Sequence, residues 1–487
     1  MKKIIISAAL LISLVSCVDE ANDYNNDHDK AYSVPSTVLL TNAEKKLADQ
    51  MITPSQGQNI FRMFSQYWTE TQYIDESRYI LLKRTISDNH WDVLMRDVLG
   101  NLEATKTAVL NETKPSSITD ANWDIQQKNK LAIIDILEVY TYQVLVDTFG
   151  DIPYSESLNP NIVLPKYDNA AAIYPKLITR LDAAISNLNT TGSSFSSGEV
   201  IYNGSASKWK LFANSLKIKL GINISDVNNA LAKSTIESAV SSGVITANSD
   251  NAKFPYVSTS PNYNPIYANL FSRNDFVPAN TIVNDMNTLN DPRRSAYFTF
   301  KPGTTNYVGG IYGSANTYSL FSHVSAPIQA ATTAGIIFEA TEVNFLLAEA
   351  AARGFVVGNT AEYYYNQAIS KSFEYWGLSS SDANTYLAGP SVAYSSSSSG
   401  STYKEKIGHQ AWIALFNRGF ESWTTWRRLD FPILTAPSSA IVDAEGKVPV
   451  RMTYPVAEQT INTESWQAAS TSIGGDKLTT KIFWDKF

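Results

Sequence analysis

The chain of 487 residues has little cysteine and little histidine: Cys17 is its one cysteine, and there are four histidines. A lone thiol cannot form a disulfide within the chain, so the stability of the fold must come from packing. No histidine lies at metal-ligand spacing from another, and no HExxH helix is present. We therefore expect neither a metal site nor a cofactor.

Signature motifs of common enzyme classes are absent as well. The chain has no GxSxG elbow, no P-loop and no GxGxxG sequence after a strand. A glycosidase that uses two carboxylates stays open, because 46 acidic residues leave many pairs whose separation in space is invisible in a sequence. We expect a protein that is not an enzyme and keep a surface hydrolase as the alternative from another class.

A basic face is also lacking. The net charge is −7, and the 39 lysines and arginines are scattered among the acids. A nucleic-acid-binding protein needs clustered positive charge to displace counterions from phosphates, so we exclude nucleic acid as a partner. After the N-terminal segment, no apolar run reaches the eighteen or so residues that a membrane-spanning helix needs.

The N-terminal segment has the pattern of an export signal. Lys2 and Lys3 precede an apolar run over residues 4–15, which is too short to span a bilayer. The run closes as Leu-Val-Ser before Cys17, which resembles a bacterial lipobox. We predict that residues 1–16 are a lipoprotein signal peptide and that Cys17 is lipidated, since several acyl chains on one residue anchor a protein stably. The alternative is an ordinary signal followed by a chance cysteine.

Residues 17–36 are acidic, rich in asparagine and aspartate, and poor in aliphatic side chains. This composition predicts a flexible tether between the lipid and the folded domain. Residues 23–29 alternate as the start of an EF-hand loop does, but His28 stands where the turn needs glycine and Val34 where the loop needs glutamate. We favour a solvated tether over a calcium site.

Helical periodicity dominates the folded part, which we place at residues 37–487. Apolar residues recur at three- and four-residue steps in the segments 131–148, 173–188, 209–220, 342–353 and 365–376. Gly354 is a C-cap of the fourth segment, and the fifth is its expected antiparallel partner. Helix pairs with short turns predict helix–turn–helix units packed side by side, although no clean 34-residue repeat is present.

The sequence changes character at about residues 244–335. Proline, glycine, asparagine, serine and tyrosine become frequent there, and the helical stripes vanish. Such a long stretch of loops and short strands exceeds the usual connection between elements, and loops of that size inside a compact protein usually carry function.

The stretch from Trp412 to Leu434 is dense in aromatic and guanidinium groups. Gly419 is expected to allow a bend, and it is followed by Glu421, Trp423, Trp426 and two arginines. Such a cluster can stack a sugar or form a buried Arg–Glu pair. We favour the structural role, in which the cluster fixes the C-terminal segment.

This stretch resembles the SusD/RagB family, the nutrient-uptake lipoproteins of Bacteroidota, and more narrowly its SusD-like branch. The matching positions are Leu415, Gly419, Glu421, Trp423, Trp426, Arg427, Arg428 and Pro432. Further pieces agree in order: FGDIPY at 149–154, NFLLAEAAARG at 344–354, RMTYP at 451–455 and KIFWDK at 481–486. The likeness covers essentially the whole chain after the signal segment.

The resemblance implies a mainly α fold, with a tetratricopeptide-like scaffold of helix pairs and a large loop-rich region on the ligand side. It also implies a lid over a SusC-like TonB-dependent barrel in the outer membrane, to which oligosaccharides or, alternatively, peptides are delivered. Asp19 and Glu20 resemble the acidic signal that sends such lipoproteins to the cell surface, though Val18 occupies its first position. We therefore expect a lipid-anchored outer-membrane protein that faces outward.

Ligand stacking in this family uses exposed aromatic residues from loops. Two regions offer aromatic and polar side chains together: Trp68 and Tyr73 early in the chain, and Tyr263 and Tyr312 in the loop-rich stretch. A sugar presents an apolar face that such a ring can cover. For each of these side chains, packing inside the fold is the alternative role.

Overall fold

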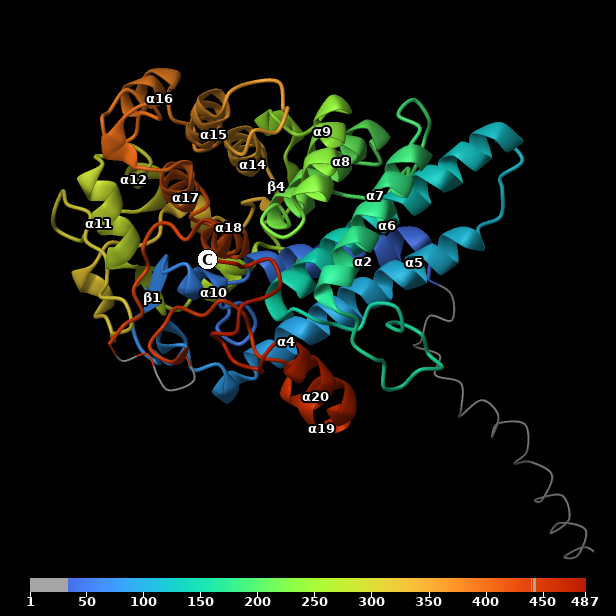
Figure 1. Ribbon diagram of the computed structural model, residues 1–487, viewed down its shortest axis with the longest axis horizontal. Coiled ribbons are helices and arrows are strands. Elements are labelled where there is room, and N and C mark those ends of the chain that lie inside the picture. Colours follow the sequence, from blue (N-terminus) through green and yellow to red (C-terminus); the bar gives the residue numbers. More distant parts are fainter. Residues whose placement is uncertain (1–33, 439, 441–443) are drawn as a thin grey trace, which may run out of the picture.

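The structure is a computed structural model that describes residues 34–438, 440 and 444–487. It is mainly helical (Figure 1), as expected. The N-terminal half contains α2 (Ser36–Ile52), α3 (Phe61–Phe64), α4 (Ile86–Asp92), α5 (Gly100–Leu110), α6 (Asp120–Phe149), α7 (Ala170–Asn187), α8 (Ala206–Asn223) and α9 (Asn229–Ser241). Further helices are α10 (Pro265–Leu270), α11 (Asn280–Thr288), α12 (Arg294–Tyr297), α13 (Ala326–Gln329), α14 (Ala340–Ala352), α15 (Ala361–Tyr375), α16 (Ser380–Leu387), α17 (Tyr403–Ala414), α18 (Gly419–Leu429), α19 (Val456–Ile461) and α20 (Thr463–Ser472). A π-helical segment, η3 (Val93–Leu99), joins α4 to α5.

The long helices pack as a row of neighbours (Figure 1). Helix α2 packs on α5, α5 on α6, α6 on α7, and α7 on α8. Helix α8 then contacts α9 and α14, and α14 contacts α15 and α17. The segments with helical periodicity fall in α6, α7, α8, α14 and α15, so the prediction of a helix-pair scaffold is confirmed. The tether predicted over residues 17–36 lies outside the described residues except for its last three positions, and α2 begins at Ser36.

Local capping sets the ends of these helices. The Thr119 side chain accepts a hydrogen bond from the Asn122 backbone N–H at the start of α6. Gly354 follows α14 with a φ of +84°, and its N–H donates to the Ala351 carbonyl while the next N–H donates to the Ala350 carbonyl. This is the Schellman arrangement, which needs a left-handed residue, so the C-cap role of Gly354 is confirmed.

The loop-rich stretch is built of short elements, of which α11 has nine residues. Strand β1 (Trp68–Glu70) pairs antiparallel with β3 (Phe276–Pro278), and β2 (Ala252–Phe254) pairs with β4 (Gly335–Phe338). The first pair aligns Trp68 with Pro278 and Glu70 with Phe276. The pairing thus holds the early aromatic segment against the loop-rich stretch.

The C-terminal motif is enclosed by the scaffold through a buried ion network. The Arg418 guanidinium bonds to Glu339 at 3.3 Å, to Glu421 at 3.1 Å and to Glu342, and Lys219 Nζ lies 2.9 Å from Glu342. All five side chains are buried. Buried charges are tolerated only when they are paired, so this network fixes α18 against α8 and α14.

Aromatic packing completes the enclosure. The Arg427 guanidinium lies 3.5 Å from the Trp423 ring centroid and 4.8 Å from that of Trp484, and it donates to the Asp147 carbonyl at 2.7 Å. Burial lowers the pKa of Arg427 to about 10. Because Trp423 and Arg427 are buried, neither can stack a ligand, and the structural role that we favoured for this motif is confirmed.

Two buried carboxyl groups lie at the end of β1. Glu70 accepts hydrogen bonds from the Ser77 backbone N–H at 3.3 Å and from Gln56 Nε2 at 3.4 Å, and Glu76 pairs with Arg84. Burial raises the pKa of Glu70 to about 8, and the neighbouring Glu76 carboxylate adds to the rise. Burial also raises the pKa of Glu76, although Arg84 opposes that change. At neutral pH Glu70 therefore holds a proton.

Gly419→Ala is expected to destabilise the protein by about 1–3 kcal/mol. An added Cβ would lie 2.6 Å from the Arg62 backbone nitrogen and 2.8 Å from the Phe61 carbonyl carbon, because α18 begins in contact with α3. Chemical denaturation measures the change in the free energy of unfolding. Gly100→Ala is the matched control: its Cβ would lie 3.9 Å from the Met95 carbonyl oxygen, an ordinary contact, and a helical Gly→Ala change is neutral or stabilising. Equal stabilities of the two variants would contradict this packing.

Glu70→Gln is expected to raise stability at neutral and basic pH. The folded pKa of about 8 lies above the ordinary carboxyl value, so the stability that Glu70 contributes is complete below about pH 4 and is lost as the pH rises toward 8. The variant, which imitates the protonated group, should gain on the parent by up to about 1.4 kcal/mol per pH unit in that window. Denaturation at a series of pH values tests this. Exposed Glu464→Gln serves as control, and parallel curves for parent and Glu70→Gln would refute the assignment.

Candidate functional site

A polar pocket of about 420 Å³ opens beside the end of β1. It is formed by three segments: the loop after α2, the turns that follow β1 and, far from both in sequence, the approach to β3. The antiparallel pairing of β1 with β3 brings the last two together. The lining residues are Ser55, Gln56, Gly57, Tyr73, Arg84, Asn269, Arg273 and Asp275.

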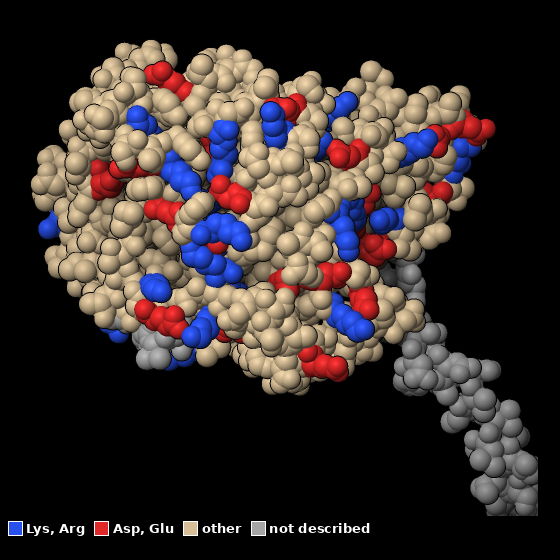
Figure 2. All heavy atoms as spheres, in the orientation of Figure 1, with Lys and Arg blue, Asp and Glu red and all other residues tan. Residues whose placement is uncertain are grey.

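Charged groups of both signs line this pocket. The Arg273 guanidinium donates two hydrogen bonds to the Asp275 carboxylate, from Nε to Oδ2 at 2.6 Å and from Nη2 to Oδ1 at 3.3 Å. Arg84 binds the buried Glu76, and the Arg273 side chain is 58% exposed. Acidic and basic side chains are likewise interspersed over the face drawn in Figure 2. The pocket thus offers both donors and acceptors, which suits a hydroxyl-rich ligand.

Tyr73 supplies the aromatic surface of the pocket. Its side chain is 64% exposed, and its φ of +56° places it in the left-handed region that residues other than glycine rarely adopt. Backbone strain of this kind tends to occur at functional sites, where the surrounding structure stabilises it. The strained turn therefore holds a large ring at the surface.

A row of aromatic side chains runs along α10, the helix that contributes Asn269 to the pocket. Ring centroids lie 5.3 Å apart for Tyr263 and Tyr267, and 5.4 Å apart for Tyr267 and Phe271. Phe271 is 72% exposed, and the two tyrosines are half-buried. Asn264 starts this helix by accepting a hydrogen bond from the Ile266 N–H at 2.7 Å. The row extends the apolar surface next to the pocket.

The four aromatic residues expected to bind ligand fall into two groups. Tyr73 and Tyr263 reach the surface. Trp68 is fully buried, with its ring centroid 5.5 Å from that of Phe276, and Tyr312 is buried with its hydroxyl donating to the Met63 carbonyl at 2.6 Å. Neither buried ring offers a face to a ligand, because Trp68 packs against Phe276 of β3 and Tyr312 packs against α3 and the Tyr79 ring.

Sequence reasoning missed the polar lining of the pocket. Arg84 lies eleven positions after Tyr73, and a cation near an aromatic turn was a usable signal. Arg273 and Asp275 had none, because only the strand pairing brings them to the site. Residues 1–33 lie outside the described residues. They include Cys17 and all of the EF-hand-like stretch except its last position, Val34.

Among residues 34–438, 440 and 444–487, no three His, Cys, Asp or Glu side chains are grouped so that they could hold a metal ion. In the same part of the chain, none of the helices has the length and apolarity to cross a membrane.

Comparison with known proteins identifies the family. The sequence profile of the SusD-like_2 family, described as "Starch-binding associating with outer membrane", matches residues 27–455. No curated protein matches the chain. A SusD homologue from Bacteroides uniformis superposes with a TM-score of 0.78 at 27% identity, covering 94% of this chain and 100% of that one.

Two further solved structures are similar at the same level. A protein named as chitin-binding has a TM-score of 0.78 and 26% identity, with coverage of 93% of this chain and 100% of that one. A chitin-binding SusD homologue from Flavobacterium johnsoniae has a TM-score of 0.78 and 25% identity, with coverage of 92% and 98%. Together with the profile match, these likenesses confirm the resemblance found in the sequence: the chain belongs to the SusD-like family.

Proposed function

We propose that the protein is a cell-surface lipoprotein that binds oligosaccharides and passes them to a SusC-like TonB-dependent transporter in the outer membrane. The observation that carries the proposal is the pocket beside Tyr73, where an exposed ring stands among polar and charged groups. The family description of starch binding and the chitin-binding names of two similar structures support a glycan as the ligand.

The chemistry of the pocket suits a pyranose ring. The Tyr73 ring can cover the apolar C–H face of a sugar, while Arg84, Arg273 and Asp275 hydrogen-bond its hydroxyls. The Arg273–Asp275 pair is already formed, so its two groups are oriented before the ligand arrives. Such preorganisation lowers the entropy that binding costs.

Peptide binding at the same pocket is the second candidate. The Arg273–Asp275 pair could meet a terminal carboxylate and ammonium group, which favours that alternative among other ligand classes. Hydrolysis is less supported: Asp275 is the one acidic side chain among the described residues that line the pocket, whereas a glycosidase needs two carboxyl groups.

The proposed membrane attachment rests on the N-terminal segment. Residues 1–16 would be the signal peptide, Cys17 the lipidated residue and 17–36 a tether that leads to the helical domain at 37–487, within which about 244–335 form the loop-rich insertion. A tether of that length would leave the domain free to swing as a lid on its transporter while it stays anchored.

Tyr73→Ala should weaken glycan binding about tenfold, which corresponds to about 1.4 kcal/mol, because the stacking surface is removed while the polar groups stay. Isothermal titration against glycan pools and peptide pools measures the effect. Tyr363→Ala removes an exposed tyrosine from α15 and is the matched control that should bind as the parent does. Glycan affinity equal in parent and Tyr73→Ala would count against this pocket, and product release from the pools would count against pure binding.

Cys17→Ala should yield a folded protein that no longer partitions with the outer membrane, since the thiol is the proposed site of acylation. Membrane fractionation measures the partition, and circular dichroism checks that the variant is folded. Asn25→Gln, a conservative change within the proposed tether, is the control, since it leaves both the signal peptide and Cys17 unchanged. Unchanged membrane association of Cys17→Ala would overturn the lipid anchor.

A further inference from the structure

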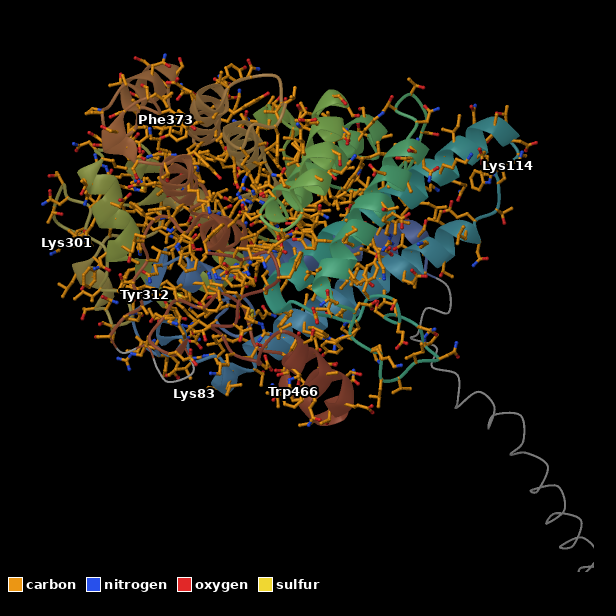
Figure 3. All side chains as sticks on the ribbon, in the orientation of Figure 1. Lys83, Lys114, Lys301, Tyr312, Phe373 and Trp466 are labelled. Carbon is orange, nitrogen blue, oxygen red and sulfur yellow. The ribbon has the colours of Figure 1, made fainter. Side chains whose placement is uncertain are left out.

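A second groove, of about 460 Å³, lies between the turn η2 (Leu82–Arg84) and the C-terminal helices α19 and α20. Figure 3 shows Trp466 on the helical pair at the lower edge of the molecule and Lys83 on the neighbouring turn. The groove is lined by Leu81, Leu82, Glu445, Thr453, Gln459, Trp466, Asp476, Lys477 and Leu478. None of these residues lines the Tyr73 pocket.

Hydrogen bonds that lead back to the core orient Trp466. Its indole Nε1 donates to Asp476 Oδ2 at 3.0 Å, and Asp476 Oδ1 accepts from Arg451 Nη1 at 2.7 Å and from the Tyr454 N–H at 3.0 Å. Arg451 is fully buried and donates through Nη2 to the Phe149 carbonyl at 3.0 Å. The ring itself is half-buried. Its orientation is therefore fixed while part of its surface stays open, as a stacking platform requires.

The walls of the groove combine apolar surface with hydrogen-bonding groups. Leu81 and Leu82 supply aliphatic surface to the same groove that Trp466 lines. Lys477 and Glu445 form an exposed ion pair at 2.7 Å, and Gln459 donates to the Tyr454 carbonyl at 3.0 Å, which fixes its amide. The groove combines an aromatic plane, aliphatic side chains and polar groups at its edge. This combination suits a sugar ring, whereas an apolar peptide side chain would need a wholly apolar pocket.

The turn η2 connects this groove to the Tyr73 pocket. Leu82 lines the groove and Arg84 lines the pocket. A 3₁₀ turn rises about 2.0 Å per residue, so the backbones of Leu82 and Arg84 are offset by about 4 Å along its axis. Lys83 stands between them with its side chain 63% exposed. A chain of sugars that crosses this turn would therefore contact both linings.

We propose that the Trp466 groove is a second subsite for the same oligosaccharide, so that the protein selects long chains over short ones. This inference rests on the proposed glycan binding at Tyr73. Two subsites joined by one ligand bind it more tightly than either does alone, because the second contact is intramolecular once the first has formed.

Titration with chito-oligosaccharides and malto-oligosaccharides of increasing length, from dimer to octamer, tests the proposal. In the parent, affinity for one of the two series should rise with length. Trp466→Ala should remove that rise, with a loss of about tenfold for the octamer and no loss for the dimer. Trp466→Phe keeps a ring and should retain most of the rise. Trp123→Ala, on α6, is the matched control, and thermal unfolding checks that each variant folds.

The outcomes separate the two proposals. Loss of binding in Tyr73→Ala with an unchanged length dependence in Trp466→Ala would overturn the second subsite and leave the proposed function standing. Equal losses for dimer and octamer in Trp466→Ala would also overturn it, since they would indicate a general structural effect. Binding of a peptide pool in place of both glycan series would overturn both proposals.

Discussion

The pairing of Arg418 with its buried carboxylates is the interaction on which the rest of the structure depends. Burial alone would raise the pKa of Glu342, but Lys219 and Arg418 together lower it below its ordinary value. The pKa of Glu339 is raised to about 7, because the effect of burial exceeds the opposing effect of the Arg418 charge. Leaving one of these buried charges unpaired would cost about 3–5 kcal/mol. A shift of α18 that breaks the pairs is therefore strongly unfavourable.

Helix α18 in turn positions the N-terminal segment that carries β1. Arg62 donates from Nη2 to the Asn417 carbonyl at 3.1 Å, and Ser65 donates to the Gly419 carbonyl at 3.1 Å. The Phe61 ring lies 5.1 Å from both the Phe420 and Trp423 rings. Strand β1 leaves this contact, pairs with β3 and ends at the polar pocket. Helix α18 therefore positions the strand that leads to the polar pocket, although no residue of α18 lines that pocket.

Much of the scaffold could be predicted from the sequence, because α6, α7 and α14 carry their apolar residues at the helical period and Gly354 marks an end. The candidate site could be predicted only in part. Trp68 and Tyr73 stand five positions apart in one aromatic, polar segment, yet the first is buried and the second exposed. The difference in their burial comes from the partner strand β3, which covers Trp68 but does not extend to Tyr73. Strand β3 lies some two hundred positions later in the sequence, so no local pattern reveals this pairing. The same pairing brings Arg273 and Asp275 to the pocket.

The contact between the first and last parts of the chain also sets the order in which the protein can fold. The Tyr67 hydroxyl donates to the Trp412 carbonyl, 345 residues away in sequence, and its oxygen accepts a hydrogen bond from the Ser422 hydroxyl. Contacts of such long range close slowly, because the loop entropy must be lost before any of them forms. Tyr67 stays uncovered until the C-terminal motif has been synthesised and docked. A chain truncated before that motif would thus lack the contacts that support β1 and, with them, the strand that leads to the polar pocket.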